Sequence, residues 1–176
     1  MEAGASAIER IFQVNALELD TEGSVAFAAA LCDTSWEELF DVTVGQAPNM
    51  FTLVKLVEVA DTHLTRIRLV WSRVWPVYGQ HLVKAGMHSH PAVAAAAVDA
   101  LCRFAGALLE RSAVSQGSFQ AEALRPLAEL AAAQPPPEVM LLLLSGLQQL
   151  LQTHQHGERD REHSTSSARR PVSVWE

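Results

Sequence analysis

The residues best suited to a chemical task lie in one short run, residues 65–75, which holds three arginines and two tryptophans. A guanidinium group donates paired hydrogen bonds to carboxylates and phosphates. Arg and Trp are also the residue types most enriched where binding energy concentrates in protein interfaces. The run therefore predicts recognition of a partner, with Arg66, Arg68 and Arg73 as candidate contacts. Arg125 is a fourth candidate, later in the same basic stretch.

These candidates also have a purely structural interpretation. Arg66 and Arg68 can satisfy the last carbonyls of a preceding helix, or pair with an acid such as Asp61. Trp71 and Trp75 are four residues apart, so they share one face of a helix. Because a helix turns its large aromatic side chains inward, we expect both tryptophans to be core packing that supports the arginines.

Catalytic and metal-binding patterns are weak in this sequence. Histidine pairs separated by one residue occur at 88–90 and 154–156, but a zinc site needs four ligands and no cysteine or carboxylate is spaced to complete one. The two cysteines, Cys32 and Cys102, form neither a disulfide framework nor a metal motif, which favours buried thiols in a reducing compartment. No nucleophile elbow or phosphate-binding glycine loop occurs. The sequence predicts no enzyme activity, no metal and no cofactor.

The charge is spread unevenly along the chain. The formal net charge of −7 divides into −9 over residues 1–62, +4 over residues 63–125 and −2 over residues 126–176. The acidic total argues against nucleic acid as a partner, since phosphates would be repelled. The basic middle favours an acidic protein face or anionic headgroups, so peripheral membrane contact remains open. No uncharged apolar run reaches the length of a membrane-spanning helix.

Apolar spacing predicts an all-helical chain. Ser24 is expected to begin one helix, and a capping box at residues 35–38 another. Gly86 is expected to end a third helix in a left-handed conformation, while Pro76 falls in a first turn or kinks the helix. The predicted helices cover residues 6–12, 24–32, 35–44, 51–64, 70–85, 91–111, 119–133 and 137–154.

The predicted helices suggest a repeat architecture. They recur in pairs at intervals of roughly 40 residues, the spacing of HEAT and armadillo units. We therefore expect an all-α, HEAT/armadillo-like α-solenoid segment of paired antiparallel helices, although an orthogonal helical bundle would show the same periodicity. The expected domains are a helical-repeat module over residues 1–154 and a disordered polar tail over residues 155–176, where apolar periodicity stops.

Several segments resemble one protein family. Residues 66–75 are similar to the pattern Arg-Ile-Arg-Leu-x-Trp-Ser-Arg-Ile-Trp, with Val74 in the second Ile position. That pattern occurs in the large brefeldin A-inhibited guanine nucleotide-exchange proteins, just downstream of their catalytic domain. The resemblance is collinear over residues 7–153, and its other matching segments are 7–12, 31–39, 50–58, 97–101 and 119–127.

The resemblance implies a function. These proteins activate Arf-type small G proteins at the Golgi, and this region implies recognition of GTP-bound Arf, recruitment to trans-Golgi membranes from the cytosol, and contact with other segments of the exchange factor. The family's catalytic domain and its glutamate are not in this sequence, so exchange activity is not expected of it. The alternatives are a purely structural helical spacer and a generic α-helical protein-binding adaptor.

Overall fold

The computed structural model describes residues 10–12, 14, 16–40, 47–64, 70–112 and 117–167. Every regular element within these ranges is helical, which confirms the all-α prediction. Helical residues in 10–18 precede six long helices. The six are α2 (Thr21–Phe40), α3 (Phe51–His63), α4 (Ser72–Gly86), α5 (Pro91–Ser112), α6 (Gly117–Ala132) and α7 (Pro137–Ser167).

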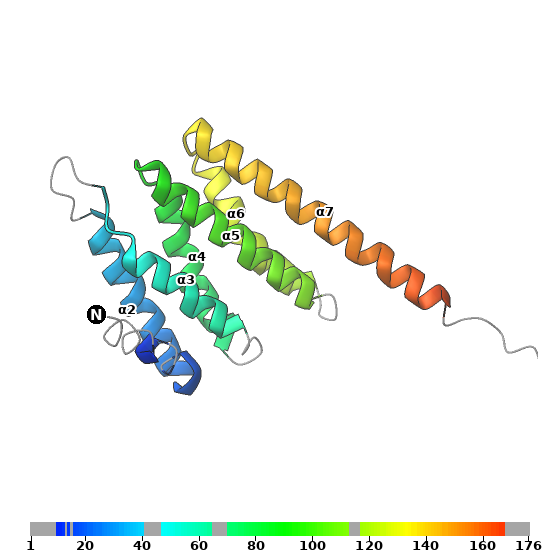
Figure 1. Cartoon of the computed structure of the whole chain (residues 1–176), viewed down its shortest axis with the longest axis horizontal. Helices are drawn as coiled ribbons and strands as arrows, with labels where there is room; N and C mark the ends of the chain where they lie inside the picture. The colour runs from blue at the N-terminus through cyan, green and yellow to red at the C-terminus, as the bar shows by residue number, and fades with distance from the viewer. Residues whose placement is uncertain are drawn as a thin grey trace, which may run out of the picture.

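The helices contact one another in a regular order (Figure 1). α2 packs against α3 and α4, α4 packs against α5 and α6, and α5 packs against α6 and α7. The even-numbered helices therefore touch in series, while the odd-numbered α5 and α7 lie together. An ion pair between Asp61 of α3 and Arg103 of α5, at 3.3 Å, adds a link between these two helices. α4 and α5 are consequently the centre of the molecule.

The core follows the predicted apolar stripes. On α5 the expected inner residues Val93, Ala97, Leu101, Phe104 and Leu108 are all buried. Burial of this kind stabilises a helix by about 1.5–3 kcal/mol for each large aliphatic or aromatic side chain. α5 is also the one helix in the described chain that is long and apolar enough to cross a membrane by length and composition, and half of that stretch is buried against its neighbours. A core helix of this composition meets the same criteria.

α2 differs from the prediction of two separate helices. It is continuous from Thr21 to Phe40, and Asp20 rather than Ser24 caps it, since the Asp20 Oδ1 atom accepts a 2.7 Å hydrogen bond from the Gly23 N–H. Ser24 and Ser35 are buried inside the helix. The apparent capping box does not cap a helix, because no helix begins at Ser35. The Ser35 side chain faces α4 and belongs to the buried face of α2.

Glu38 of the expected capping box serves a neighbouring helix instead. Its Oε2 atom accepts a 2.9 Å hydrogen bond from the Thr52 N–H at the start of α3. Asn49 Oδ1 accepts a 3.1 Å hydrogen bond from the neighbouring backbone donor, the Phe51 N–H. Together they satisfy two of the four unpaired N–H groups that every helix start presents. The α2–α3 joint is therefore fixed by side chains as well as by apolar contacts.

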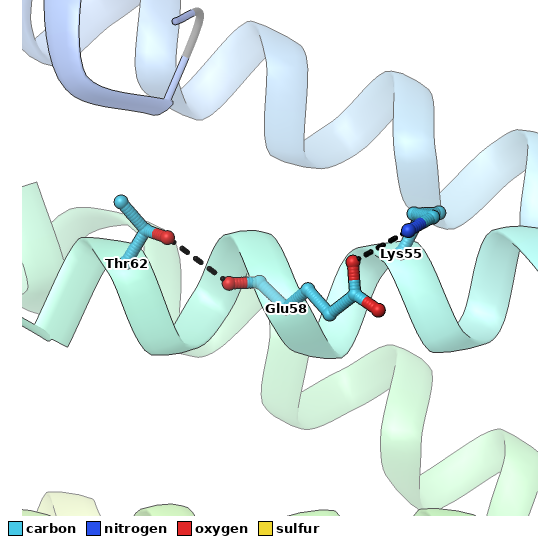
Figure 2. Close-up of polar contacts among 3 residues, drawn as sticks. All are labelled: Lys55, Glu58 and Thr62. Atoms are coloured by element: carbon cyan, nitrogen blue, oxygen red, sulfur yellow. Dashed lines mark hydrogen bonds and ion pairs between the residues drawn. The ribbon is translucent and has the colours of Figure 1, made fainter. Parts of the chain in front are cut away.

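α3 matches its predicted range and keeps a polar face. Figure 2 shows Lys55 Nζ at 2.7 Å from Glu58 Oε2, and Thr62 Oγ1 donating a 3.2 Å hydrogen bond to the Glu58 carbonyl. The Lys55 side chain is only 14% exposed, whereas that of Glu58 is 49% exposed. The pair therefore lies at the edge of the solvent-facing side of α3.

The two ends of α4 correct further expectations. Gly86 is helical rather than left-handed, and Met87 is the cap residue, with a φ of −91°. A Cβ on Gly86 would meet both Leu130 methyl carbons at 3.1 Å, so glycine there serves the close approach of α6. At the other end a π turn at Val70 and Trp71 leads into the helix, and Pro76 lies inside it.

α7 is longer than predicted. It begins at Pro137, as expected, but continues to Ser167, so residues 155–167 of the predicted disordered tail are helical. Residues 155–167 include two Glu, two Arg and one Gln, residue types that favour helix without needing an apolar face. In Figure 1 the end of α7 projects past its neighbours. Residues 168–176 of the tail lie outside the described ranges.

Candidate partner-binding site

The predicted arginines have different places in the structure. Arg66 and Arg68 lie outside the described residues. Arg73 is exposed near the start of α4, and its Nη2 atom lies 2.8 Å from Glu22 Oε1 of α2. Arg125 is exposed on α6, with its Nε atom 2.7 Å from Glu129 Oε1 of the same helix. Arg73 and Arg125 thus belong to two neighbouring helices of the α2–α4–α6 series.

The two tryptophans of the run lie in the core. Trp71 is fully buried and Trp75 is 5% exposed. Their rings stack with centroids 5.4 Å apart, and the Phe104 ring of α5 meets both edge-on. Aromatic pairs in these geometries add about 0.5–1.5 kcal/mol beyond their buried area. The indole N–H of Trp71 is buried and finds no hydrogen-bond partner among the described residues.

Trp75 also makes a specific polar contact with α6. Its indole Nε1–H donates a 2.9 Å hydrogen bond to the Glu122 carbonyl oxygen. In an uninterrupted helix that oxygen would accept from residue 126, but Pro126 has no N–H. Trp75 therefore supplies the donor that Pro126 lacks. Pro126, which lies in the family-matching segment 119–127, and the predicted packing residue Trp75 are therefore parts of one joint.

The Pro126 ring lies directly against α4. A Cβ placed on Gly79 would come within 2.7 Å of Pro126 Cγ. Only a glycine lets the two helices approach this closely while the proline ring stays in place. Because Gly79 and Trp75 are one turn apart, the same face of α4 both admits the ring and satisfies the carbonyl. The α4–α6 joint is thus positioned by shape and by one hydrogen bond.

A shallow hollow of about 80 Å³ opens beside this joint. Its apolar lining is Trp75, Pro76 and Pro126, and its polar rim comprises Gln80, Glu122, Arg125 and Glu129. Arg125 and Glu129 are on the solvent side, where an ion pair contributes only about 0.2–1 kcal/mol. Arg125 can therefore exchange Glu129 for a carboxylate of a partner at little cost. The same reasoning applies to Arg73, whose pair with Glu22 is also exposed.

Two cysteines and one histidine of the described chain are held neutral by burial. Burial raises the pKa of the Cys32 thiol to about 12 and of Cys102 to about 11, with Asp33 and Asp99 respectively adding to the effect. Burial, helped by Lys84, lowers the pKa of His81 to about 4. Among the described residues no three His, Cys, Asp or Glu side chains are grouped to hold a metal ion.

Trp36 is a surface residue that sequence reasoning missed. It entered the sequence analysis only as part of the expected capping box, yet it is 37% exposed on α2. Its ring lies against that of Phe40, with centroids 4.1 Å apart and the two planes tilted by 41°. The available signal was its register. Leu31, Ser35 and Leu39 form the inward stripe at spacings of four, and towards the end of α2 the residues that follow Ser35 and Leu39, namely Trp36 and Phe40, are exposed.

Comparison with known proteins assigns the chain to one group of relatives. No protein-family profile matches it. Brefeldin A-inhibited guanine nucleotide-exchange protein 1 of Arabidopsis thaliana is 36% identical over 133 residues, which is 76% of this chain and 8% of that protein. The protein of the same name from Homo sapiens is 34% identical over 145 residues, 82% of this chain and 8% of the relative.

A yeast relative has a different name but the same kind of match. The ADP-ribosylation factor guanine nucleotide-exchange factor sec72 of Schizosaccharomyces pombe is 34% identical over 146 residues, 83% of this chain and 8% of that protein. The relatives are thus guanine nucleotide-exchange factors. The chain is related to one region of the brefeldin A-inhibited guanine nucleotide-exchange proteins, which confirms the resemblance, and it spans about 8% of their length.

Proposed function

We propose that this chain is a non-catalytic regulatory and docking region of an Arf guanine nucleotide-exchange factor. In this role it recognises activated, GTP-bound Arf and supports recruitment of the exchange factor to the cytosolic face of trans-Golgi membranes. The observation that carries the proposal is the match of about four fifths of the chain to a small part of proteins named as exchange factors. Nucleotide exchange itself would belong to another part of such a protein, upstream of this region.

The proposed architecture is a HEAT-like solenoid segment. Its units would be the antiparallel pairs α2–α3, α4–α5 and α6–α7. The serial contacts of α2 with α4 and of α4 with α6 support it, as does the packing of α5 on α7. In such a stack each unit contacts only its neighbours, and an extended face is left for a partner. This arrangement would place Arg73 and Arg125 on the same face.

The proposed contact with Arf uses these two arginines. Both guanidinium groups are more than half exposed and are held only by surface ion pairs. The hollow between α4 and α6 offers apolar surface directly beside Arg125. An acidic and apolar patch on a G protein would complement this combination. Arf anchored in a membrane would raise the local concentration of the partner, so that a weak contact would suffice for recruitment.

Direct binding of soluble Arf tests the proposal. The wild-type chain and the double variant Arg73→Glu, Arg125→Glu are titrated with Arf loaded with a GTP analogue or with GDP, by isothermal calorimetry. We expect binding of the GTP form only, weakened at least tenfold in the variant at an unchanged melting temperature. The charge-reversal control is Arg103→Glu on α5, which also removes an exposed ion pair. Equal binding by wild type and double variant would indicate a different docking face, and no binding of either nucleotide form by the wild-type chain would support a structural spacer.

A further inference from the structure

A second hollow lies between α2 and α4, on the other side of the α4 ridge formed by Pro76 and Gln80. It has a volume of about 320 Å³. Trp36 forms its α2 wall, Pro76 and Val77 form its α4 wall, and Cys32 and His81 lie deeper. The space is large enough for a branched or aromatic side chain of a partner. This hollow has no part in the proposed contact with Arf.

The mouth of this hollow carries exposed aromatic surface. Phe40 is 53% exposed and Trp36 is 37% exposed, although large aromatic side chains are usually buried. The Lys84 ammonium group lies over the Trp36 ring, 5.7 Å from its centroid. An indole face attracts cations through its quadrupole, and the attraction strengthens when water is excluded. The Trp36 ring is therefore a cation-binding surface already in use by the protein itself.

The charges around the mouth are mainly acidic. Asp33 lines the hollow, and Glu37 follows one turn later on the exposed side of α2. Within the described part of the chain no ion pair engages either carboxylate, whereas the exposed acids Glu22 and Glu129 are paired with arginines. Cys32 and His81 add no charge, because burial holds the first as a thiol and the second neutral. The carboxylates of Asp33 and Glu37 therefore outnumber the single positive charge of Lys84 at the mouth.

We propose that the α2–α4 hollow binds a cationic, amphipathic segment of a partner protein. An apolar side chain of that segment enters between Trp36 and Pro76. A neighbouring Lys or Arg displaces Lys84 from the Trp36 face and pairs with Asp33, and Glu37 attracts a second cation one helical turn away. The charge complementarity selects a basic segment over an acidic one. The proposal goes beyond the Arf contact, since it uses a different hollow and a partner of opposite charge.

Binding of two labelled peptides to the full chain tests this proposal. One peptide repeats Leu-Lys-Lys-Leu, and the other repeats Leu-Glu-Glu-Leu. Fluorescence anisotropy should show binding of the lysine peptide only. We expect Trp36→Ala to weaken it about tenfold or more, as for an interface anchor, and Asp33→Asn to weaken it about two- to fivefold, as for one exposed charge pair. Lys84→Met should tighten binding, because it removes the competing cation.

Matched controls separate this site from general attraction to an acidic protein. Glu110→Gln and Arg103→Gln change the same charges on α5, and both should leave the affinity unchanged. The proposal is overturned if Glu110→Gln weakens binding as much as Asp33→Asn, if Lys84→Met does not tighten it, or if the glutamate peptide binds instead. Self-association that Trp36→Ala abolishes would assign the patch to a second copy of the chain, and would also overturn it. Circular dichroism verifies that each variant is folded.

Discussion

Replacing Gly79 with alanine should destabilise the protein, although the same change in a solvent-facing helix would stabilise it. Ala is favoured over Gly inside a helix by about 1 kcal/mol. Here the new methyl would lie 2.7 Å from Pro126 Cγ. That is about 0.8 Å inside the ~3.5 Å at which carbon atoms begin to attract, and a proline ring cannot rotate away. Overpacking of this kind costs about 1–3 kcal/mol, so after the helix preference is subtracted we expect a net loss of up to about 2 kcal/mol.

A double-mutant cycle tests this reasoning. In a Pro126→Ala background Cγ is gone, and the remaining Cβ lies at an ordinary 3.4 Å. Gly79→Ala should then stabilise by up to about 1 kcal/mol. Urea unfolding followed by far-UV circular dichroism gives the four free energies of unfolding, and we expect a coupling of about 1–3 kcal/mol.

Gly106→Ala is the matched control for this cycle. Its Cβ would approach Leu150 Cδ2 at 2.8 Å, but a leucine methyl at the end of a flexible side chain can move. The change should therefore be neutral or stabilising. If Gly79→Ala stabilised the protein with Pro126 present, or if the two changes were simply additive, the description of the α4–α6 joint would be wrong.

Three further predictions concern polar groups in the core. Trp75→Phe leaves the Glu122 carbonyl without its donor, so the free energy of unfolding should fall by about 1–3 kcal/mol. The loss should be smaller in a Pro126→Ala background, because residue 126 then has a backbone N–H that the Glu122 carbonyl can accept from. An equal loss in both backgrounds would refute the idea that Trp75 compensates for Pro126. His81 is buried in its neutral form, and its pKa is lowered to about 4. Because the unfolded chain takes up a proton at a pKa of ~6.5, the folded state loses stability as the pH falls from ~6.5 towards 4, by about 3 kcal/mol in all. Above a pH of ~6.5 this loss is absent. His81→Gln should flatten the dependence of urea midpoint on pH in that window, and an unchanged slope would contradict the assignment. Cys32 and Cys102 should resist iodoacetamide at pH 8 in the native chain and react only when it unfolds. Burial raises both thiol pKa values to about 11–12, so little thiolate is present. Fast alkylation of the native chain, detected by mass spectrometry, would contradict this.

Much of the fold could be predicted from apolar spacing alone. The buried residues of α5 recur every three or four positions without interruption, so the sequence alone is enough to identify this helix and its inner face. The start of α5 after His90 was similarly readable from Pro91. These elements depend on local pattern, and tertiary contacts only reinforce them.

The errors arose where a tertiary contact changed the meaning of a local signal. Ser35 looked like a cap, but its Oγ atom lies 3.0 Å from His81 Nε2 of α4, inside a continuous helix. Gly86 looked like a helix terminus, but it accommodates Leu130 of α6. A capping preference is worth about 1 kcal/mol, which packing between helices easily outweighs. Neither partner could be deduced before the helices were placed in space.

The candidate site was predictable only in part. Arg73 and Arg125 were chosen for residue type, and the structure places both at the surface of adjoining helices. The hollow beside Arg125 depends on two prolines and a glycine from different helices, which no linear motif records. The exposed pair Trp36 and Phe40 was likewise hidden, because its exposure depends on which face of α2 meets α4.

The most direct test of the central claim is co-sedimentation of the chain with liposomes that carry Arf loaded with GTP or with GDP. The proposed function predicts sedimentation with the GTP form only, and its loss in the Arg73→Glu, Arg125→Glu variant. Equal sedimentation with both nucleotide forms would indicate attraction to lipid rather than recognition of Arf. No sedimentation with either form would contradict docking and leave a structural spacer as the better description.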